Sequence, residues 1–242
     1  MLLIDAGNSR IKSALWDQGS LSSLTPIETQ AEDPPADWQI LAAPSRVAIS
    51  NVAGDAIAIK LRGWVKSMWA IEPTFVAVQE NAAGVATHYE DPSQLGVDRW
   101  LAALGGYHVA KGAVAVVDAG TAITVDIVDA GGAHLGGTIA PGLSLMVESL
   151  TRNTAQLRLD SIELTDSVAA NTANAISMGC RDSLVGGIER MRHKLNRIFG
   201  SEPEWIITGG EALQVMEVCP IEFRHMPDLV LRGLMLAIED AP

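Results

Sequence analysis

Two short stretches of the chain could bind phosphate. Residues 5–8 read Asp-Ala-Gly-Asn and residues 118–121 read Asp-Ala-Gly-Thr, and each stretch lies between two apolar runs. A glycine turn between strands presents consecutive backbone N–H groups with no side chain in the way, which attracts phosphate oxygens. Asn8 and Ser9 add side-chain donors to the first turn, and Thr121 adds a hydroxyl to the second. Two such turns facing one another could hold a polyphosphate.

The carboxylates of these turns predict a bound cation. Asp5 and Asp118 would repel a nucleotide unless a positive ion lay between the carboxylate and the phosphates. Lys12 can supply one charge to the first turn. A Gly-Gly turn in the stretch TGGEA, at 208–212, is a third place where a backbone could approach a nucleotide closely.

The elements that position these turns are predicted to be two hairpins. Residues 2–16 and 114–128 each read as an apolar strand, a tight turn and an alternating strand. The two aspartates stand close to half the chain apart, which predicts a duplicated domain. The alternative is that Asp-x-Gly turns recur here by chance.

The remaining pattern predicts an α/β fold written twice, with a mixed sheet in each half, because hairpins come first and strands then alternate with helices. We place the boundary between residues 112 and 113 and interpret 18–45 as a variable surface segment. The other expected elements are strands at 47–51, 74–78 and 205–208, a strand ending at the Pro-Gly turn of HLGGTIAPG, and helices at 55–70, 143–156, 172–199 and 228–239.

Composition excludes several classes of function. The 242 residues are 48% hydrophobic and 19% charged, with a formal net charge of −12, so no basic surface for nucleic acid or anionic membranes is expected. Cys180 and Cys219 form no CxxC pair, which favours neither a disulfide framework nor a zinc site and suits the cytoplasm. No signal peptide and no apolar run long enough to span a membrane is apparent.

A series of motifs resembles type III pantothenate kinases, within the superfamily of actin, Hsp70 and the sugar kinases. Ser9 stands where that family usually has threonine, which keeps the hydroxyl, whereas the segment 18–45 matches no motif. The resemblance covers nearly the whole chain. The motifs, in order, are DAGNSRIK, YEDPSQLGVDRW, DAGTAITVD, GGTIAPG, the pair Asn171-Thr172, and PDLVLRGL.

The resemblance implies two duplicated ribonuclease-H-like domains with mixed sheets, flanking helices and an ATP cleft between them. It implies ATP-dependent phosphorylation of the primary hydroxyl of pantothenate, which begins coenzyme A synthesis. The ATP-binding residues would be Asp5, Ala6, Gly7, Asn8, Ser9, Arg10, Ile11, Lys12 and Thr121.

The motif LGVDRW would carry the chemistry. Transfer of a phosphoryl group to an alcohol needs a carboxylate to accept the hydroxyl proton, and Asp98 is the candidate. Arg99 could hold a carboxylate of the substrate in a forked pair. The alternative for Asp98 is a helix N-cap, because it precedes an apolar helical run. The substrate-binding residues would be Tyr89, Gly96, Val97, Asp98, Arg99 and Thr172.

The resemblance also implies two kinds of ion. Asp118 matches the ligand position for a monovalent cation, potassium or ammonium. Mg²⁺ would arrive with ATP, held mostly by phosphate oxygens and water. Asp5 could contact the hydrated Mg²⁺. Asp126, on the strand after the second turn, either supports the site or faces solvent.

The helix expected at 172–199 predicts an interface. Its apolar residues follow a spacing of four and three, and small residues occupy another face. That helix packs either on its own sheet or on a partner. Family members resembling this chain are homodimers with a shared pantothenate pocket, to which Thr172 of the neighbour would contribute. The apolar residues are Leu184, Ile188, Met191, Leu195 and Ile198, and the small ones Gly179, Ser183, Gly186 and Gly187.

Two other functions compete with this interpretation: a non-catalytic regulator of transcription, and another kinase or phosphatase of the superfamily. The acidic net charge argues against direct contact of a regulator with DNA, and the Asp98-Arg99 pair argues for retained activity. Trp64 and Trp69 are interpreted as packing residues, and the histidines, which lack metal-ligand spacing, as core or solvated residues. The histidines are His88, His108, His134, His193 and His225.

Overall fold

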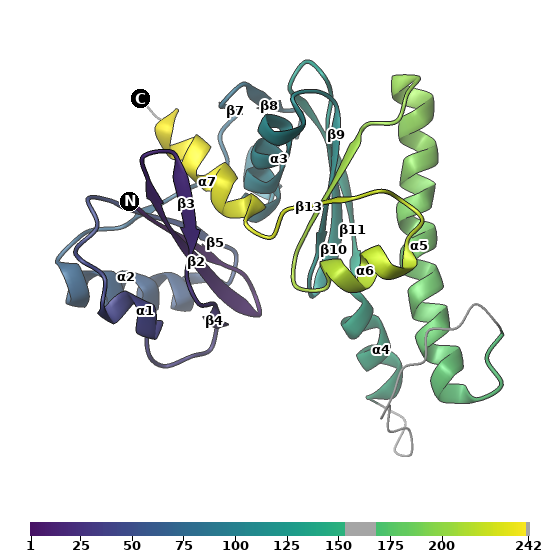
Figure 1. Ribbon diagram of the computed structural model, residues 1–242, viewed down its shortest axis with the longest axis horizontal. Coiled ribbons are helices and arrows are strands. Elements are labelled where there is room, and N and C mark those ends of the chain that lie inside the picture. The colour runs from purple at the N-terminus through teal and green to yellow at the C-terminus, as the bar shows by residue number, and fades with distance from the viewer. Residues whose placement is uncertain (153–167, 241–242) are drawn as a thin grey trace. The chain divides into compact units, whose positions relative to one another are not determined.

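The computed structural model describes residues 1–152 and 168–240. The chain divides into two compact units (Figure 1). The first unit comprises Met1–Val116, Asp126–Gly136 and Asp228–Pro242, and the second comprises Val117–Val125 and Gly137–Pro227. The boundary between the duplicated halves at 112/113 stays a prediction.

The first sheet contains the first predicted hairpin. Strand β1 (Leu2–Ala6) pairs antiparallel with β2 (Arg10–Asp17) and parallel with β5 (Val47–Asn51). β3 (Ser20–Ser23) and β4 (Ile27–Glu28) pair antiparallel with β2, and β6 (Thr74–Phe75) pairs parallel with β5. The strand order is therefore β3-β2-β1-β5-β6, a mixed sheet as the pattern predicts.

One face of this sheet packs on α2 (Asp55–Trp69), which matches the expected helix closely. The short helix α1 (Ala36–Gln39) brings Trp38 into the same cluster, fully buried, with ring centroids 6.3 Å from Trp64 and 5.8 Å from Trp69. Packing is thus confirmed for Trp64 and Trp69. The interpretation of 18–45 as a surface segment is wrong at Trp38, whose indole N–H donates to the Ser13 hydroxyl at 3.0 Å.

Two helices pack together beside β1 and β5. Their packing fixes the position of Val97, where the first of the two helices begins. They are α3 (Val97–Ala110) and α7 (Leu229–Glu239). A Cβ on Gly233 would fall on the backbone carbonyl of Leu101, and one on Gly105 would lie 2.6 Å from the Leu229 carbonyl oxygen. Contact between these two backbones requires glycine at both positions.

The second sheet repeats the order of the first. Its strands run β13-β12-β9-β10-β11-β8-β7, and the section β11-β10-β9-β12-β13 has the same succession of hairpin and later strands as the first sheet. The α/β fold with two mixed sheets is confirmed. The bounds are β7 (Asn81–Ala82), β8 (Val85–Thr87), β9 (Val114–Ala119), β10 (Ala122–Val128), β11 (Ala133–Pro141), β12 (Glu204–Thr208) and β13 (Arg224–His225).

The described residues of the second unit form the helices α4 (Leu143–Thr151), α5 (Thr172–Phe199) and α6 (Ala212–Val218). The expected bounds of α5 are confirmed, and the Asn171 side chain caps it by accepting from the Asn174 N–H at 2.9 Å. The end of the helix expected at 143–156 lies partly outside the described residues. Within the part of the chain that is described, no helix combines the length and apolarity needed to cross a membrane.

Candidate functional site

The β1–β2 turn is an exposed loop above a buried strand. The Gly7 N–H donates to the Arg10 carbonyl at 3.0 Å, and Asn8, Ser9 and Arg10 are exposed. The Thr29 hydroxyl donates to the Gly7 carbonyl at 2.7 Å and fixes the turn from outside the hairpin. The polar tip therefore projects from a rigid strand end, as a phosphate-binding turn requires.

Asp5 and Lys12 stand directly across the β1–β2 ladder from each other. Residues paired in this way point to the same face of the sheet, so the carboxylate and the ammonium share a face. Asp5 is buried and Lys12 is half-buried. The neighbours on the other face, Ala6 and Ile11, are buried in the core.

The β9–β10 turn is surrounded by backbone oxygens. The Gly120 N–H donates to the Ala122 carbonyl at 3.1 Å, and the Gly142 N–H donates to the Thr121 carbonyl at 2.9 Å. A Cβ on Gly142 would collide with the Gly120 carbonyl. Carbonyl groups and the half-buried Asp118 carboxylate therefore gather at one strand end.

The Gly-Gly turn at 209–210 closes on the same strand end. Gly209 has φ of +99°, and a Cβ there would collide with the Ala119 carbonyl and lie 2.5 Å from Asp118 Oδ1. Glu211 fixes the turn, because its N–H donates to the Ala119 carbonyl at 2.8 Å and its carboxylate accepts from the Leu143 N–H at 3.1 Å. The close approach that this glycine permits is to the protein's own β9.

Asp98 lies in the first turn of α3, and it is not the N-cap. Gly96 occupies the N-cap position, so the capping alternative is wrong. The Asp98 carboxylate accepts from the Arg99 N–H at 2.8 Å and is half-buried. Burial raises the pKa of Asp98, against the opposing effects of that N–H and of the Arg99 charge. A carboxylate with a raised pKa accepts a proton more readily.

Arg99 makes the predicted forked pair, but with Asp126. Its Nε and Nη2 groups donate to the two carboxylate oxygens of Asp126 at 2.9 and 2.7 Å. Its Nη1 donates to the Tyr89 hydroxyl at 2.9 Å. A buried carboxylate of the protein itself therefore occupies this edge of Arg99. Contact with substrate through its remaining N–H groups stays a prediction.

Asp126 does not face solvent, because its exposed fraction is 1%. Its Oδ1 also lies 2.9 Å from Nε2 of His134, which is fully buried. His134 is thus a core histidine, as expected, but its partner was missed. The alternation of side chains along a strand could have placed Asp126 and His134 on inward positions. It could not have shown that these two side chains are in contact.

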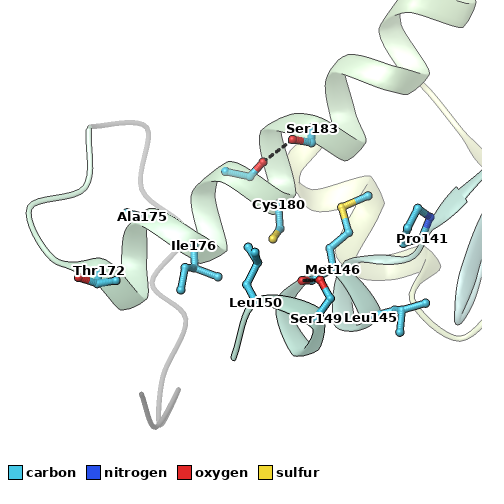
Figure 2. Close-up of a pocket in the computed structure, with 11 residues that line it drawn as sticks. Pro141, Leu145, Met146, Ser149, Leu150, Thr172, Ala175, Ile176, Cys180 and Ser183 are labelled. Carbon is cyan, nitrogen blue, oxygen red and sulfur yellow. Dashed lines mark hydrogen bonds between the residues drawn. The ribbon is translucent and has the colours of Figure 1, made fainter. Parts of the chain in front are cut away.

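A mainly apolar cavity of about 820 Å³ lies between α4 and α5 in the second unit (Figure 2). Leu150 of α4 and Cys180 of α5 point toward each other across it. Thr172, the predicted substrate residue, is exposed at the first position of α5 and lines the cavity. The remaining lining residues include Leu145, Met146, Ala175, Ile176 and Ser183.

The structure brings some predicted residues together within each unit. In the first unit, Tyr89, Gly96, Val97, Asp98 and Arg99 surround the start of α3, and the ATP-binding residues predicted at 5–12 form the β1–β2 hairpin. In the second unit, Asp118 and Thr121 share the β9–β10 turn. Among residues 1–152 and 168–240, no three His, Cys, Asp or Glu side chains are arranged to hold a metal ion.

Comparisons with known proteins agree on one family. A family model described as type III pantothenate kinase matches residues 1–194. The type III pantothenate kinase of Nitrosococcus oceani is 35% identical over 99% of this chain and 94% of its own length. That of Burkholderia thailandensis is 37% identical over 99% of this chain and 98% of its own.

Solved structures share the fold. A Campylobacter jejuni protein, described as belonging to a Baf family of transcriptional activators, superposes with a TM-score of 0.59 at 23% identity. That alignment covers 99% of this chain and 98% of the other. The ethanolamine utilization protein EutJ of Carboxydothermus hydrogenoformans gives a TM-score of 0.50 at 13% identity over 98% of this chain and 88% of its own.

Proposed function

The chain belongs to the type III pantothenate kinase family, and we infer that it transfers the γ-phosphate of ATP to the primary hydroxyl of pantothenate, the first step of coenzyme A synthesis. The observation that carries the assignment of its chemistry is the half-buried Asp98 carboxylate at the start of α3. Burial raises the pKa of this carboxylate.

Asp98 acts as the general base. Its carboxylate accepts the proton of the pantothenate hydroxyl as the oxygen attacks the γ-phosphate, which makes the oxygen a better nucleophile. The Arg99 N–H holds one carboxylate oxygen and leaves the other to accept the proton. General-base catalysis contributes about 10² to 10⁴ in rate, and positioning and charge neutralisation supply the rest.

Residues 5–12 bind ATP through the exposed turn, and Thr121 adds a hydroxyl. The proposal is supported by the exposure of Asn8, Ser9 and Arg10 at a turn that Thr29 fixes. Mg²⁺ neutralises phosphate charge and is held mostly by phosphate oxygens and water. Asp5, a buried carboxylate on β1 next to the turn, would contact the water shell of that ion.

Asp118 binds a monovalent cation, K⁺ or NH₄⁺. The donor chemistry at the end of β9 fits such an ion, since a carboxylate and the carbonyls of Ala119, Gly120 and Thr121 are all oxygen ligands. Gly209 and Gly142 keep side chains away from these oxygens. A cation held by Asp118 would supply positive charge that offsets the carboxylate, so that a phosphate could approach the turn.

The enzyme is a homodimer in which Thr172 of one chain completes the pantothenate site of the other. Support comes from the small residues of α5, since Gly179, Ser183, Gly186 and Gly187 are all exposed. Among the described residues, nothing lies within 4 Å of a Cβ built on any of these glycines. A mid-helix glycine costs about 1 kcal/mol relative to alanine, which a close partner backbone would offset.

The cysteines support a place in the cytoplasm. Cys180 and Cys219 are buried free thiols, and burial raises the pKa of Cys219 to about 11. Free thiols are the state that a reducing compartment such as the cytoplasm maintains.

The test is a coupled assay for ADP release with pantothenate, using hexoses and inorganic polyphosphate as the alternative substrates. We expect turnover with pantothenate alone, and the phosphorylated product identified by mass spectrometry. Turnover of a hexose or of polyphosphate in its place would reassign the chain to another activity of the superfamily. Absence of any turnover in K⁺ and Mg²⁺ would favour a regulatory protein.

A further inference from the structure

We propose that Asp126 and His134, neither of which is predicted to touch substrate, position Arg99 and Tyr89 for pantothenate. The inference rests on the proposed function, because it assigns a task to residues behind that site. Its basis is a closed ring of contacts within the first unit that runs through Tyr89, Arg99, Asp126, His134 and Thr87.

Asp126 is the centre of the ring. Its two oxygens accept from the two N–H groups of one edge of Arg99, and Oδ1 also lies against Nε2 of His134, so the carboxylate has no freedom to turn. A two-bond pair between guanidinium and carboxylate fixes the plane of the guanidinium as well as its distance. Arg99 itself is only 7% exposed, which strengthens these contacts by excluding water.

His134 joins the pair to Tyr89. The imidazole stacks on the Tyr89 ring, with centroids 5.9 Å apart and planes 12° apart, and the edge of Trp100 lies against it. Its Nδ1 lies 3.4 Å from the Thr87 hydroxyl, whose oxygen accepts from the Tyr89 N–H at 3.2 Å. One buried ring thus restrains both the side chain and the backbone of Tyr89.

The consequence is preorganisation of the substrate-facing atoms. The Tyr89 hydroxyl receives the Nη1 bond of Arg99, so the tyrosine and the arginine are held as one body. Because the two side chains are ordered before the substrate arrives, the entropic cost of ordering them does not weaken substrate binding. Arg99 also donates its backbone N–H to Asp98, which places the base beside the same body. We therefore expect substitutions in this ring of contacts to change KM for pantothenate and to leave KM for ATP unchanged.

Two substitutions at His134 distinguish its hydrogen bond with Asp126 from its stacking on Tyr89. His134→Phe keeps a ring against Tyr89 but removes the group facing Asp126, whereas His134→Gln keeps an N–H donor near the position of Nε2. We expect His134→Phe to raise KM for pantothenate roughly tenfold, with KM for ATP unchanged, and His134→Gln to restore most of the loss. A folded His134→Phe variant with the parental KM for pantothenate would overturn the proposal, as would equal effects on both substrates.

Asp126→Asn gives a second readout, the pH profile. The charged groups acting on Asp98 are Arg99, which lowers its pKa, and Asp126, which raises it. Burial is the main cause of the raised pKa of Asp98, and it remains when asparagine replaces Asp126. The substitution removes the Asp126 charge, which also raises that pKa, so the acid limb of kcat/KM moves to lower pH. A limb that stays in place or moves upward contradicts the proposal. If Asp126→Asn does not fold, the comparison of His134→Phe with His134→Gln tests the proposal by itself.

A measurement without turnover keeps the proposal distinct from the proposed function. The Arg99 Nε–H resonance, assigned by its loss in Arg99→Lys, should exchange slowly with water in the parent and in His134→Gln. In His134→Phe we expect exchange roughly tenfold faster. Equal exchange in all three overturns the positioning role, even if pantothenate is phosphorylated. Failure of the parent to phosphorylate pantothenate removes the proposed function and leaves this measurement standing.

Discussion

The Asp98 carboxylate lies where a side chain on Gly96 would begin: Asp98 Oδ1 is 2.7 Å from the position of a Cβ on residue 96. The glycine therefore serves the proposed base directly, by leaving room for its carboxylate over the start of α3. Gly96 is also one of the residues that are expected to bind the substrate. Both roles require the same absence of a side chain.

Gly96→Ala should lower turnover more than it lowers stability. The obstructed atom is the end of a side chain, so Asp98 can rotate away at small cost in folding free energy, but its carboxylate then leaves the position of the base. We expect kcat to fall roughly tenfold or more, with a Tm close to that of the parent. Steady-state kinetics and thermal unfolding check this.

The matched control is Gly63→Ala, at an exposed position in α2 with nothing described within 4 Å of the added carbon. It should keep parental turnover and gain up to about 1 kcal/mol in stability. Equal turnover in both alanine variants would mean that the position of the Asp98 carboxylate does not limit the reaction.

Asp98→Asn should lower kcat by about 10² to 10⁴ while KM for pantothenate changes little. The raised pKa means that the folded protein favours the protonated acid. Its contribution to stability is therefore greatest below the unfolded pKa and is lost as pH rises through the folded pKa. At neutral pH the asparagine variant should be at least as stable as the parent, as urea unfolding at pH 7 would measure.

The raised pKa of Asp98 also determines where kcat/KM of the parent falls at acid pH. Because the base works only when ionised, kcat/KM should fall as pH drops through a value above the ordinary range of an aspartic acid. Turnover of Asp98→Asn within about threefold of the parent, well below the effect of a general base, would assign proton transfer to another group.

Particular residues show how far the sequence determines this fold. The hairpins at 2–16 and 114–128 were predicted because turn chemistry is local, and α5 because its apolar pattern continues over 28 residues. The strands β7 and β8 were missed, since two or three residues give no periodicity. Trp38 was missed because a lone aromatic in a polar segment does not reveal which helix it meets.

The candidate site divides in the same way. Asp98 stands in a recognisable motif, so the sequence alone singled it out. The partners of Arg99 could not be predicted, because Asp126 and His134 come from strands β10 and β11, and only the register of the folded sheet brings them to one helix start. The sequence predicted a forked pair between Arg99 and a carboxylate of the substrate; the structure shows such a pair with Asp126, and contact of Arg99 with the substrate stays a prediction.

Activity should rise when K⁺ or NH₄⁺ replaces Na⁺, and Asp118→Asn should abolish that response. The reason is electrostatic: a carboxylate at a phosphate-binding turn needs a cation to offset it. Initial rates at constant ionic strength in chloride salts of the three cations provide the measurement. Equal parental rates in Na⁺ and K⁺ would remove the ion from the mechanism, and a K⁺ response retained by Asp118→Asn would place it elsewhere.

The shared site predicts complementation between two inactive variants. Thr172→Arg puts a bulky charge at the exposed start of α5 and should block the partner's pantothenate site, while Asp98→Asn removes the base from its own. A mixed dimer then contains one site with both defects and one with neither. Random exchange of equal amounts should restore about one quarter of the parental activity per subunit, because half the dimers are mixed and half their sites are intact.

His193→Arg is the control, since it adds a charge at an exposed position near the other end of α5. This variant should be active alone and should not rescue inactivity in Thr172→Arg beyond the activity that it contributes itself. Subunit exchange is followed separately, with a different affinity tag on each variant. Proven exchange without recovered activity would confine Thr172 to its own chain, and a fully active monomer at assay concentration would remove the shared site altogether.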